Sequence, residues 1–404
     1  MEYTERTQVW LDQRINEAAG RGTSRRPYYS GSSRVEEVPV DHVLGVARAL
    51  SVLESLSCVD FGSCLDVGAG TGWLAHLIRR HFGVAVSTVD LSREFCVWSR
   101  GAFGFPAHAA NAAGLPFRDD TFDVVVCSEV IEHVEHPLAV LGELRRVARR
   151  AVVVTTQESC LESWERRMLI ASADDSPHAE RNYFMPADFV DFFGANTEVR
   201  PLMRLPERVR LFGLGSIEEL AACVLDITGA TTLERGSYGV VAVAHLDECR
   251  RPSVASRNEL LSAVLACDRE LGGASGFETD WPPPTGIVAP VVLGEPRPVC
   301  PACLGDIEEE EPGTRLQCAA CGAVYAIDRG APILLAPESV VSRNDACQLA
   351  RPELADFARA LGGPRWSSAP ARLGLRAALR LHRFMRSPIN YKDKSRLVWR
   401  VLFH

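Results

Sequence analysis

The chain has 404 residues, of which 47% are hydrophobic and 24% charged, and its formal net charge is −8. The length predicts two or three domains, and the composition excludes a collagen-like repeat, a coiled coil and disorder throughout. No apolar stretch is long enough to predict a transmembrane helix, and the first residues lack a secretory signal pattern. The expected compartment is therefore the cytoplasm.

The N-terminal segment over residues 1–40 is polar and is expected to be mobile. Residues 41–57 repeat apolar side chains at helical spacing, and strand-like and helix-like segments then alternate. We expect strands over 63–67, 84–89, 122–127 and 151–155, and helices over 73–82, 92–100 and 138–149. This alternation predicts an α/β fold with a doubly wound, Rossmann-like parallel sheet, in a domain that spans residues 41–271.

The second half of this domain has a looser pattern. The expected elements are helices over 186–194, 216–227 and 257–270 and an antiparallel strand pair from 231–234 and 239–246. Residues 272–297 are rich in proline and glycine and predict a linker. A cysteine-rich module over 298–336 and a helical basic tail over 337–404 complete the expected organisation.

A glycine-rich turn follows the first predicted strand. Asp66, Gly68, Gly70 and Gly72 form a D-x-G-x-G-x-G pattern between a strand and a helix. Glycine permits a sharp turn and a close approach of the backbone to a ligand, and a helix N-terminus offers free N–H groups. The spacing differs from the G-x-G-x-x-G of dinucleotide-binding turns, so a pyrophosphate site is the weaker interpretation. A tight turn without a ligand is the alternative.

Three further features follow this turn in order. Asp90 and Leu91 end the second strand, where a carboxylate can accept hydrogen bonds from both hydroxyls of a ribose. Asn111 and Ala112 follow the third strand of the alternation, which precedes 122–127 and has no bounds assigned, and they precede a Leu-Pro-Phe tripeptide. Residues 122–134, at the end of the fourth strand, read FDVVVCSEVIEHV.

With these motifs the sequence resembles the class I S-adenosylmethionine-dependent methyltransferases, in the branch that carries LPF, FDVV and EVIEHV. The resemblance is close over residues 62–156 and loose over 157–246. It implies S-adenosylmethionine as the cofactor, with Asp66 at its ammonium group and Ser128 beside its sulfonium centre. The other implied contacts are Gly68, Gly70 and Gly72 at the methionine part, Asp90 and Leu91 at the ribose, and Asn111 and Ala112 at the adenine.

The candidate catalytic residues lie just past the fourth predicted strand. Methyl transfer from a sulfonium depends mainly on positioning and desolvation, so the acceptor usually needs only the removal of a proton. His133 is the natural general base because an unperturbed imidazole titrates near neutrality, and Glu129 and Glu132 are the other candidates. The alternative is that Glu132 and His133 only cap or orient the next helix.

A metal-dependent version of this site is a further alternative. Glu129, Glu132 and His133 resemble the triad that holds a divalent metal in ubiquinone-biosynthesis O-methyltransferases, and such ligands suit Mg²⁺ or another oxygen-loving cation. The same letters are common in this branch without a known metal. The insert after the fifth strand holds three residues that either contact a substrate or belong to an ordinary polar loop: His178, Arg181 and Tyr183.

Four of the thirteen cysteines form two C-x-x-C knuckles: Cys300, Cys303, Cys318 and Cys321. Four thiolates in two close pairs suit a closed tetrahedral zinc site, and with no open ligand position the zinc is expected to be structural. A rubredoxin-like iron site is the runner-up, and redox pairs are less favoured. The module resembles the small zinc-ribbon proteins that activate methyltransferases of the translation machinery. It is expected to stabilise the catalytic domain or to dock a substrate, and a zinc-pinned domain with neither role is the alternative.

The charge is unevenly spread along the chain. Residues 365–404 carry a net charge of +9, which leaves −17 on the first 364 residues. Within 371–386, five arginines at helical spacing predict one basic stripe. Docking of this tail on the protein's own acidic body is favoured, and an anionic membrane surface or RNA phosphates are the alternatives.

Three classes of function remain. The favoured one is an enzyme that O-methylates a small molecule or a glycan. The alternative is a methyltransferase of RNA or of a translation protein, which the zinc module and the basic tail favour. Against it, residues 128–131 read Ser-Glu-Val-Ile, not the N/D-P-P-Y/F tetrapeptide of amino-group methylation. A non-catalytic cofactor-binding scaffold is disfavoured because the acidic and glycine positions of the motifs are intact.

Overall fold

The computed structural model describes most of the chain. The described residues are 3–20, 40–157, 159–160, 162–173, 176–204, 214–233, 237–247, 253, 255–270, 296–362, 372, 374–375 and 377–378. Almost all of the expected linker and most of the expected arginine stripe lie outside these residues.

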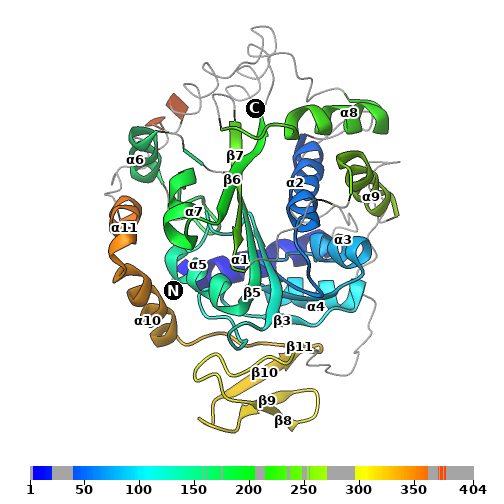
Figure 1. Cartoon of the computed structure of the whole chain (residues 1–404). Coiled ribbons are helices and arrows are strands. Elements are labelled where there is room, and N and C mark those ends of the chain that lie inside the picture. Colours follow the sequence, from blue (N-terminus) through cyan, green and yellow to red (C-terminus); the bar gives the residue numbers. More distant parts are fainter. Residues whose placement is uncertain are drawn as a thin grey trace.

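Seven strands form the central sheet in the order β3-β2-β1-β4-β5-β7-β6 (Figure 1). Their bounds are β1 Ser63–Val67, β2 Ala85–Asp90, β3 Ala107–Ala109, β4 Phe122–Ser128, β5 Ala148–Thr156, β6 Thr197–Arg204 and β7 Ser237–His245. Strands β1 to β5 run parallel, and β7 lies antiparallel between β5 and β6. The predicted Rossmann-like fold is confirmed, and the strand order reverses between β1 and β4, where such sheets bind ligands.

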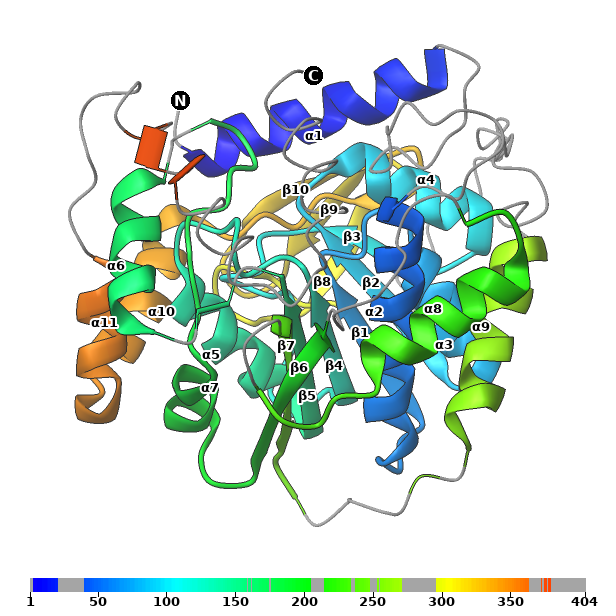
Figure 2. The ribbon, with the colours of Figure 1, turned by 90° about the horizontal axis from the view of Figure 1, so that it is seen from above.

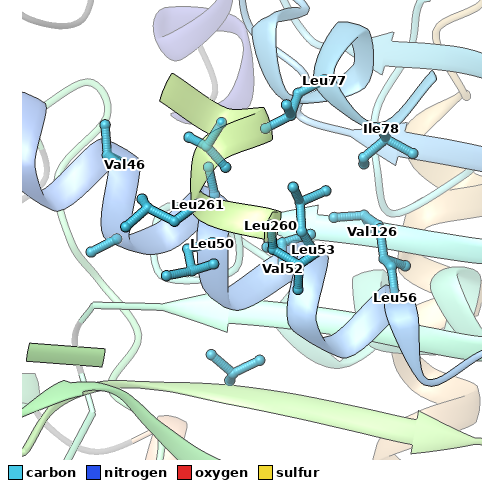
Figure 3. Packing of buried hydrophobic residues seen from close by; sticks show 14 of the residues in the cluster. Val46, Leu50, Val52, Leu53, Leu56, Leu77, Ile78, Val126, Leu260 and Leu261 are labelled. Carbon is cyan, nitrogen blue, oxygen red and sulfur yellow. The ribbon is translucent and has the colours of Figure 1, made fainter. Parts of the chain in front are cut away.

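Helices cover both faces of this sheet (Figures 1 and 2). Their bounds are α2 Val40–Ser57, α3 Trp73–Phe82, α4 Arg93–Phe103, α5 Pro137–Val147, α6 Ser163–Ser172, α7 Pro186–Phe193, α8 Ile217–Thr228 and α9 Arg257–Glu270. Side chains alternate along β4, so Val124 packs with α2, α3, α8 and α9, whereas Val125 packs with α5 and α7. Figure 3 shows part of the first core, in which Leu50 of α2 and Leu261 of α9 belong to one cluster.

The N-terminal segment differs from its expectation. Residues 3–20 form helix α1 (Tyr3–Gly20), so the prediction of a mobile segment is wrong over this range. Tyr3, Thr7 and Leu11, spaced four residues apart, are 5%, 5% and 6% exposed and form one buried stripe. The polar residue in the middle of this stripe hides the amphipathic pattern in the sequence.

The last strands also pair differently from the prediction. β7 pairs with β5 and with β6, and not with residues 231–233, which form no strand. The sequence of β6, TEVRPLMR, contains a proline and three charged residues and so gives no strand signal. Its proline, Pro201, is tolerated because β6 lies at the edge of the sheet.

The cysteine-rich module is a small antiparallel sheet beside the main one (Figure 1). Its strands are β8 Ile307–Glu311, β9 Arg315–Cys318, β10 Val324–Asp328 and β11 Ala331–Pro332, and α10 Glu338–Leu349, a 3₁₀ turn Pro352–Leu354 and α11 Ala355–Leu361 follow. Ile333 forms a parallel bridge with Ala109 of β3, and the N–H of Leu334 donates to the Ala109 carbonyl at 2.7 Å. The module is therefore hydrogen-bonded to the β3 edge of the main sheet.

Candidate functional site

The glycine-rich turn joins β1 to α3. Gly68, Gly70 and Gly72 have φ angles of 74°, 52° and 79°, a region that glycine enters without steric cost. The N–H of Gly68 donates to the carbonyl of Val89 at 2.7 Å, which ties the turn to β2. A Cβ on Gly70 would meet nothing within 4 Å, so the backbone at Gly70 borders open space.

Two buried carboxylates flank this turn. Asp90 accepts N–H hydrogen bonds from Gly70 and Ser92, both at 2.8 Å. Oδ2 of Asp66 is buried and has no hydrogen-bond partner among the described residues. Burial, followed by the charge of Asp90, raises the pKa of Asp66 to about 7, and burial raises the pKa of Asp90 to about 6. A buried acceptor beside a second carboxylate suits a cationic ligand group, such as the ammonium of the expected cofactor.

A cavity of about 230 Å³ adjoins the turn. The predicted site residues that line it are Asp66, Gly68, Gly70, Asp90, Leu91, Asn111, Ala112, Ser128, Glu129 and His133. Gly72 and Glu132 do not line it. A Cβ on Gly72 would lie 2.8 Å from Cβ of Ser99 in α4, so Gly72 permits close packing beside α4. The tertiary structure thus brings residues from the ends of four predicted strands to one cavity.

Two of the expected cofactor contacts are also hydrogen-bonded within the protein. Oδ1 of Asn111 accepts the N–H of Ala113 at 2.9 Å, and Oγ of Ser128 lies 2.8 Å from Oγ1 of Thr155. An amide oxygen has two lone pairs, so Asn111 retains one acceptor position for an adenine amino group. These bonds fix the direction of both side chains.

Helices α1 and α2 complete the cavity wall, and the sequence analysis assigned their residues no role. The additional lining residues are Tyr3, Thr4, Thr7 and Leu11 of α1 and Gly45, Arg48 and Ala49 of α2. Helix α1 crosses above the sheet (Figure 2). Hydrogen bonds attach α1 to the rest of the domain. Asp12 accepts from Oγ of Ser92, at the start of α4, at 2.5 Å, and Oη of Tyr3 donates to the carbonyl of Ala179, in the insert after β5, at 3.3 Å. The four-residue spacing of the buried stripe is the signal that could have identified α1.

His133 is held by the segment around His178. Nδ1 of His133 lies 3.2 Å from the carbonyl oxygen of Ala179, and the rings of His133 and His178 stack with centroids 4.0 Å apart. Trp10 of α1 stacks on the other imidazole, His178, at 5.3 Å. Burial lowers the pKa of His133, and burial followed by the charge of His133 lowers the pKa of His178 to about 3. Both rings are therefore neutral at neutral pH.

The structure does not assemble the expected divalent-cation site. Glu129 lines the cavity, and its Oε1 accepts from Oγ1 of Thr155 at 3.0 Å. Glu132 is 2% exposed, lies outside the cavity lining, and accepts the N–H of Arg181 at its backbone carbonyl. Within the described part of the chain, only the four cysteines bring three or more metal-ligating residues together. Glu129 and Glu132 occupy different environments, so the described structure does not bring Glu129, Glu132 and His133 together as one ligand set, and the cation site stays a prediction.

The insert after β5 separates into core and cavity residues. Tyr183 is 1% exposed and its hydroxyl donates to the carbonyl of Glu180 at 3.2 Å, so Tyr183 belongs to the core. The guanidinium of Arg181 lies 3.8 Å from the ring centroid of Tyr3 in α1. Of the three residues singled out in the insert, only His178 lines the cavity.

The four knuckle cysteines form the second candidate site. Their sulfur atoms all lie within 4.8 Å of one another, with Sγ of Cys300 3.7 Å from Cys321 and Sγ of Cys303 3.5 Å from Cys318. A tetrahedral zinc with Zn–S bonds of about 2.3 Å requires sulfur separations of about 3.8 Å, so the arrangement fits zinc. The residue after each knuckle has a positive φ, Leu304 at 59° and Gly322 at 74°, which folds both knuckles alike.

The module and helix α10, which follows it, contact the segment that carries Asn111 and Ala112. The N–H of Val299 donates to the carbonyl of Pro116 at 2.8 Å, and Nδ2 of Asn344 donates to the carbonyl of Ala113 at 2.9 Å. The two sites are thus connected through residues 109–116. No described helix is long and apolar enough to cross a membrane.

Residues 65–154 match the family described as "Methyltransferase domain", so the chain contains such a domain. The chain is 43% identical over 56 residues to the uncharacterized protein MJ0638 of Methanocaldococcus jannaschii, which is 13% of this chain and about a quarter (24%) of that protein. Three solved structures are similar to this chain at TM-scores below 0.4.

Magnesium protoporphyrin IX methyltransferase of Synechocystis, solved with bound S-adenosylmethionine, is 16% identical at a TM-score of 0.37 and covers 61% of this chain and 98% of that one. An S-adenosylmethionine-dependent methyltransferase of Thermotoga maritima is 16% identical at a TM-score of 0.38. The match covers 59% of this chain and 99% of that one. A third similar chain comes from the complex of the Haloferax volcanii Trm112 methyltransferase activator with a methyltransferase. It is 14% identical at a TM-score of 0.39, and the match covers 60% of this chain and 100% of that one.

Proposed function

We propose that this chain is an S-adenosylmethionine-dependent methyltransferase that methylates a hydroxyl group of a small molecule or a glycan. The observation that carries this proposal is the cavity beside Gly68 and Gly70, which the carboxylates of Asp66 and Asp90 share with the imidazole of His133. A cation-binding group, a ribose-binding group and a neutral base therefore border one space. The match of residues 65–154 to a methyltransferase domain supports the same assignment.

The residues of the cavity fit this cofactor. Asp66 offers a buried, unpaired oxygen to an ammonium group, and Asp90 offers a carboxylate to the ribose hydroxyls. Asn111 and Ala112 border the adenine position in this assignment. When bound, S-adenosylmethionine supplies an electrophilic methyl group on a sulfonium.

His133 is the general base in this proposal. Because the carbonyl of Ala179 can only accept a hydrogen bond, Nδ1 of His133 carries the hydrogen and Nε2 is left as an acceptor. The lowered pKa keeps this nitrogen unprotonated at neutral pH. Nε2 can then take the proton of the acceptor hydroxyl while the methyl group is transferred.

Helix α1 supports a small acceptor. It borders the cavity with four side chains and is hydrogen-bonded to α4 through Asp12 and to the insert after β5 through Tyr3. Because α1 walls one side of the cavity, we favour a small acceptor over an RNA or a protein.

The cysteine-rich module, in this proposal, binds a structural zinc and stabilises the catalytic domain from within the chain. Its support is the hydrogen bonds from Val299 and Leu334 of the module, and from Asn344 of the following helix α10, to residues 109–116. No ligand position of the four-sulfur site is left open, so the zinc would not take part in the reaction.

Incubation with methyl-labelled S-adenosylmethionine and a fractionated cell extract tests the proposal. We expect label in the small-molecule or glycan fraction, and none with the Asp90→Ala variant. Label in RNA or protein would instead support the alternative acceptor class. Cofactor binding without transfer to any fraction would leave a non-catalytic scaffold.

A further inference from the structure

The cavity has a cofactor end and a second end around His133. Leu11 of α1 belongs to one apolar cluster with Leu91, at the ribose position. Tyr3, about 12 Å earlier along the helix, donates to the carbonyl of Ala179, and the same carbonyl lies 3.2 Å from Nδ1 of His133. We call the lining residues around His133 the acceptor end: Tyr3, Thr4, Thr7, His133, Val134, Glu135, His136 and His178.

The acceptor end consists mainly of polar side chains, and hydrogen bonds join its walls. Oγ1 of Thr4, on α1, donates to Oε2 of Glu135, in the segment after β4, at 3.4 Å. Oγ1 of Thr7, one turn later on α1, accepts the N–H of His178 at 3.4 Å. A hydroxyl and a carboxylate are thus placed together on the wall that also carries His133. Such a surface suits an acceptor with several hydroxyl groups better than an apolar one.

Charge in the cavity favours a neutral acceptor. Arg48 is the only lysine or arginine among the described residues that line the cavity, and its Nε lies 3.7 Å from Oε1 of Glu129. Nδ1 of His136 lies 3.2 Å from Oδ2 of Asp345 in α10, and this hydrogen bond raises the pKa of His136. Both cationic groups therefore already contact a carboxylate, and Glu135 adds another. A phosphate or carboxylate on the acceptor would lose hydration without gaining a cation of its own.

Glu135 lies two residues after the base of the proposed mechanism, His133, and both line the cavity. An ionised carboxylate only accepts hydrogen bonds, and its two oxygens offer about four lone-pair sites, of which Thr4 uses one. We propose that Glu135 accepts a hydrogen bond from a hydroxyl adjacent to the one that His133 deprotonates, so the acceptor is a neutral, sugar-like compound with a vicinal diol. This inference rests on the proposed function.

Chemical treatment of the acceptor fraction tests the diol. The small-molecule and glycan fractions of a cell extract are treated with periodate, which cleaves the carbon–carbon bond of a vicinal diol, and the excess reagent is quenched. The protein and methyl-labelled S-adenosylmethionine are then added. Transfer of label should fall at least about tenfold relative to a fraction that received quenched periodate. Treatment of the same fraction with a phosphatase should leave the transfer unchanged.

Variants of the acceptor end test the residues. Glu135→Gln keeps the size of the side chain but removes its charge, so the initial rate at limiting acceptor should fall at least about tenfold. The KM for S-adenosylmethionine should change by less than about threefold, because Glu135 belongs to the acceptor end. Thr4→Val should lower the same rate by a smaller factor. Glu218→Gln, an exposed position of α8 outside the cavity lining, is the control, and thermal melting checks that each variant is folded.

The outcomes distinguish the two proposals. If the wild-type protein labels neither untreated fraction, the proposed function fails. If it labels one of them and the transfer survives periodate or is lost after phosphatase, the proposed function stands and the neutral diol is wrong. Folded Glu135→Gln with the wild-type rate would also overturn the inference. Loss of transfer after N-acetylation of the fraction would identify an amine as the acceptor and overturn both proposals.

Discussion

The imidazole rings of His133 and His178 lie almost parallel, with 4.0 Å between their centroids and 20° between their planes. A positive charge on either ring would raise the energy of a charge on the other. Burial lowers the pKa of both histidines, and the charge of His133 lowers that of His178 further. The pair therefore keeps a neutral imidazole at the cavity over the physiological pH range.

This arrangement predicts the pH profile of the enzyme. The rate should rise with pH through the lowered pKa of His133 and be level above about pH 7, because only the neutral ring accepts a proton. His133→Ala should reduce kcat by roughly 10²–10⁴ while cofactor affinity changes little. His81→Ala, on α3 and outside the cavity lining, is the matched control. Full turnover by folded His133→Ala would exclude His133 as the general base.

Two glycines of the turn should respond differently to alanine. A Cβ on Gly68 would lie 2.1 Å from Cγ2 of Val130, whereas a Cβ on Gly70 would meet nothing within 4 Å. Both changes carry the strain of a positive φ, on the order of 1–3 kcal/mol. Gly68→Ala should therefore lower the melting temperature more, and Gly70→Ala should mainly weaken cofactor binding. Equal melting temperatures for the two variants would contradict this reasoning.

Cofactor affinity should depend on pH through Asp66. The pKa of Asp66 is raised to about 7 in the ligand-free protein, and a cationic ammonium group binds its ionised form. Affinity should thus increase with pH, by about tenfold between pH 6 and pH 8, with proton release at the lower pH. Asp90, with a pKa of about 6, adds to the same trend. Calorimetry on wild type and Asp66→Asn should show a weaker pH dependence in the variant.

Loss of the metal should destabilise the segment over residues 109–116, which borders the cofactor site. Cys318→Ser is expected to abolish the binding of one zinc per chain, measured by elemental analysis, and to unfold the module over 298–336. Because Val299 and Leu334 of the module donate hydrogen bonds to residues 109–116, amide exchange in that segment should accelerate. Cys347→Ser, an exposed cysteine of α10, is the control. A metal-free wild-type protein with unchanged melting would refute the zinc assignment.

Much of the fold follows from local pattern. The valine-rich strands β4 and β5 and the glycine turn after β1 are visible in the sequence because burial on both faces and positive φ angles restrict residue choice. The resemblance to methyltransferases implied that Asp66, Asp90 and Ser128 contact one cofactor, and they line one cavity because parallel strands present their carboxyl ends at one edge of the sheet. The two C-x-x-C pairs predicted a cluster of four cysteines, because two such pairs at this spacing are typical of a single metal site.

The tertiary structure decided what lies opposite these motifs. Helix α1 carries only a weak local signal, because a polar residue, Thr7, lies within its buried stripe. Arg48 carries none, because it is one arginine among many. Glu129 and Glu132 share one motif in the sequence, yet only Glu129 borders the cavity, because a positive φ at Glu129 changes the direction of the chain. Contacts such as His133 with Ala179, 46 residues apart, depend on how the insert packs. Sequence pattern determines which residues can face a strand end, whereas long-range packing determines which of them face each other.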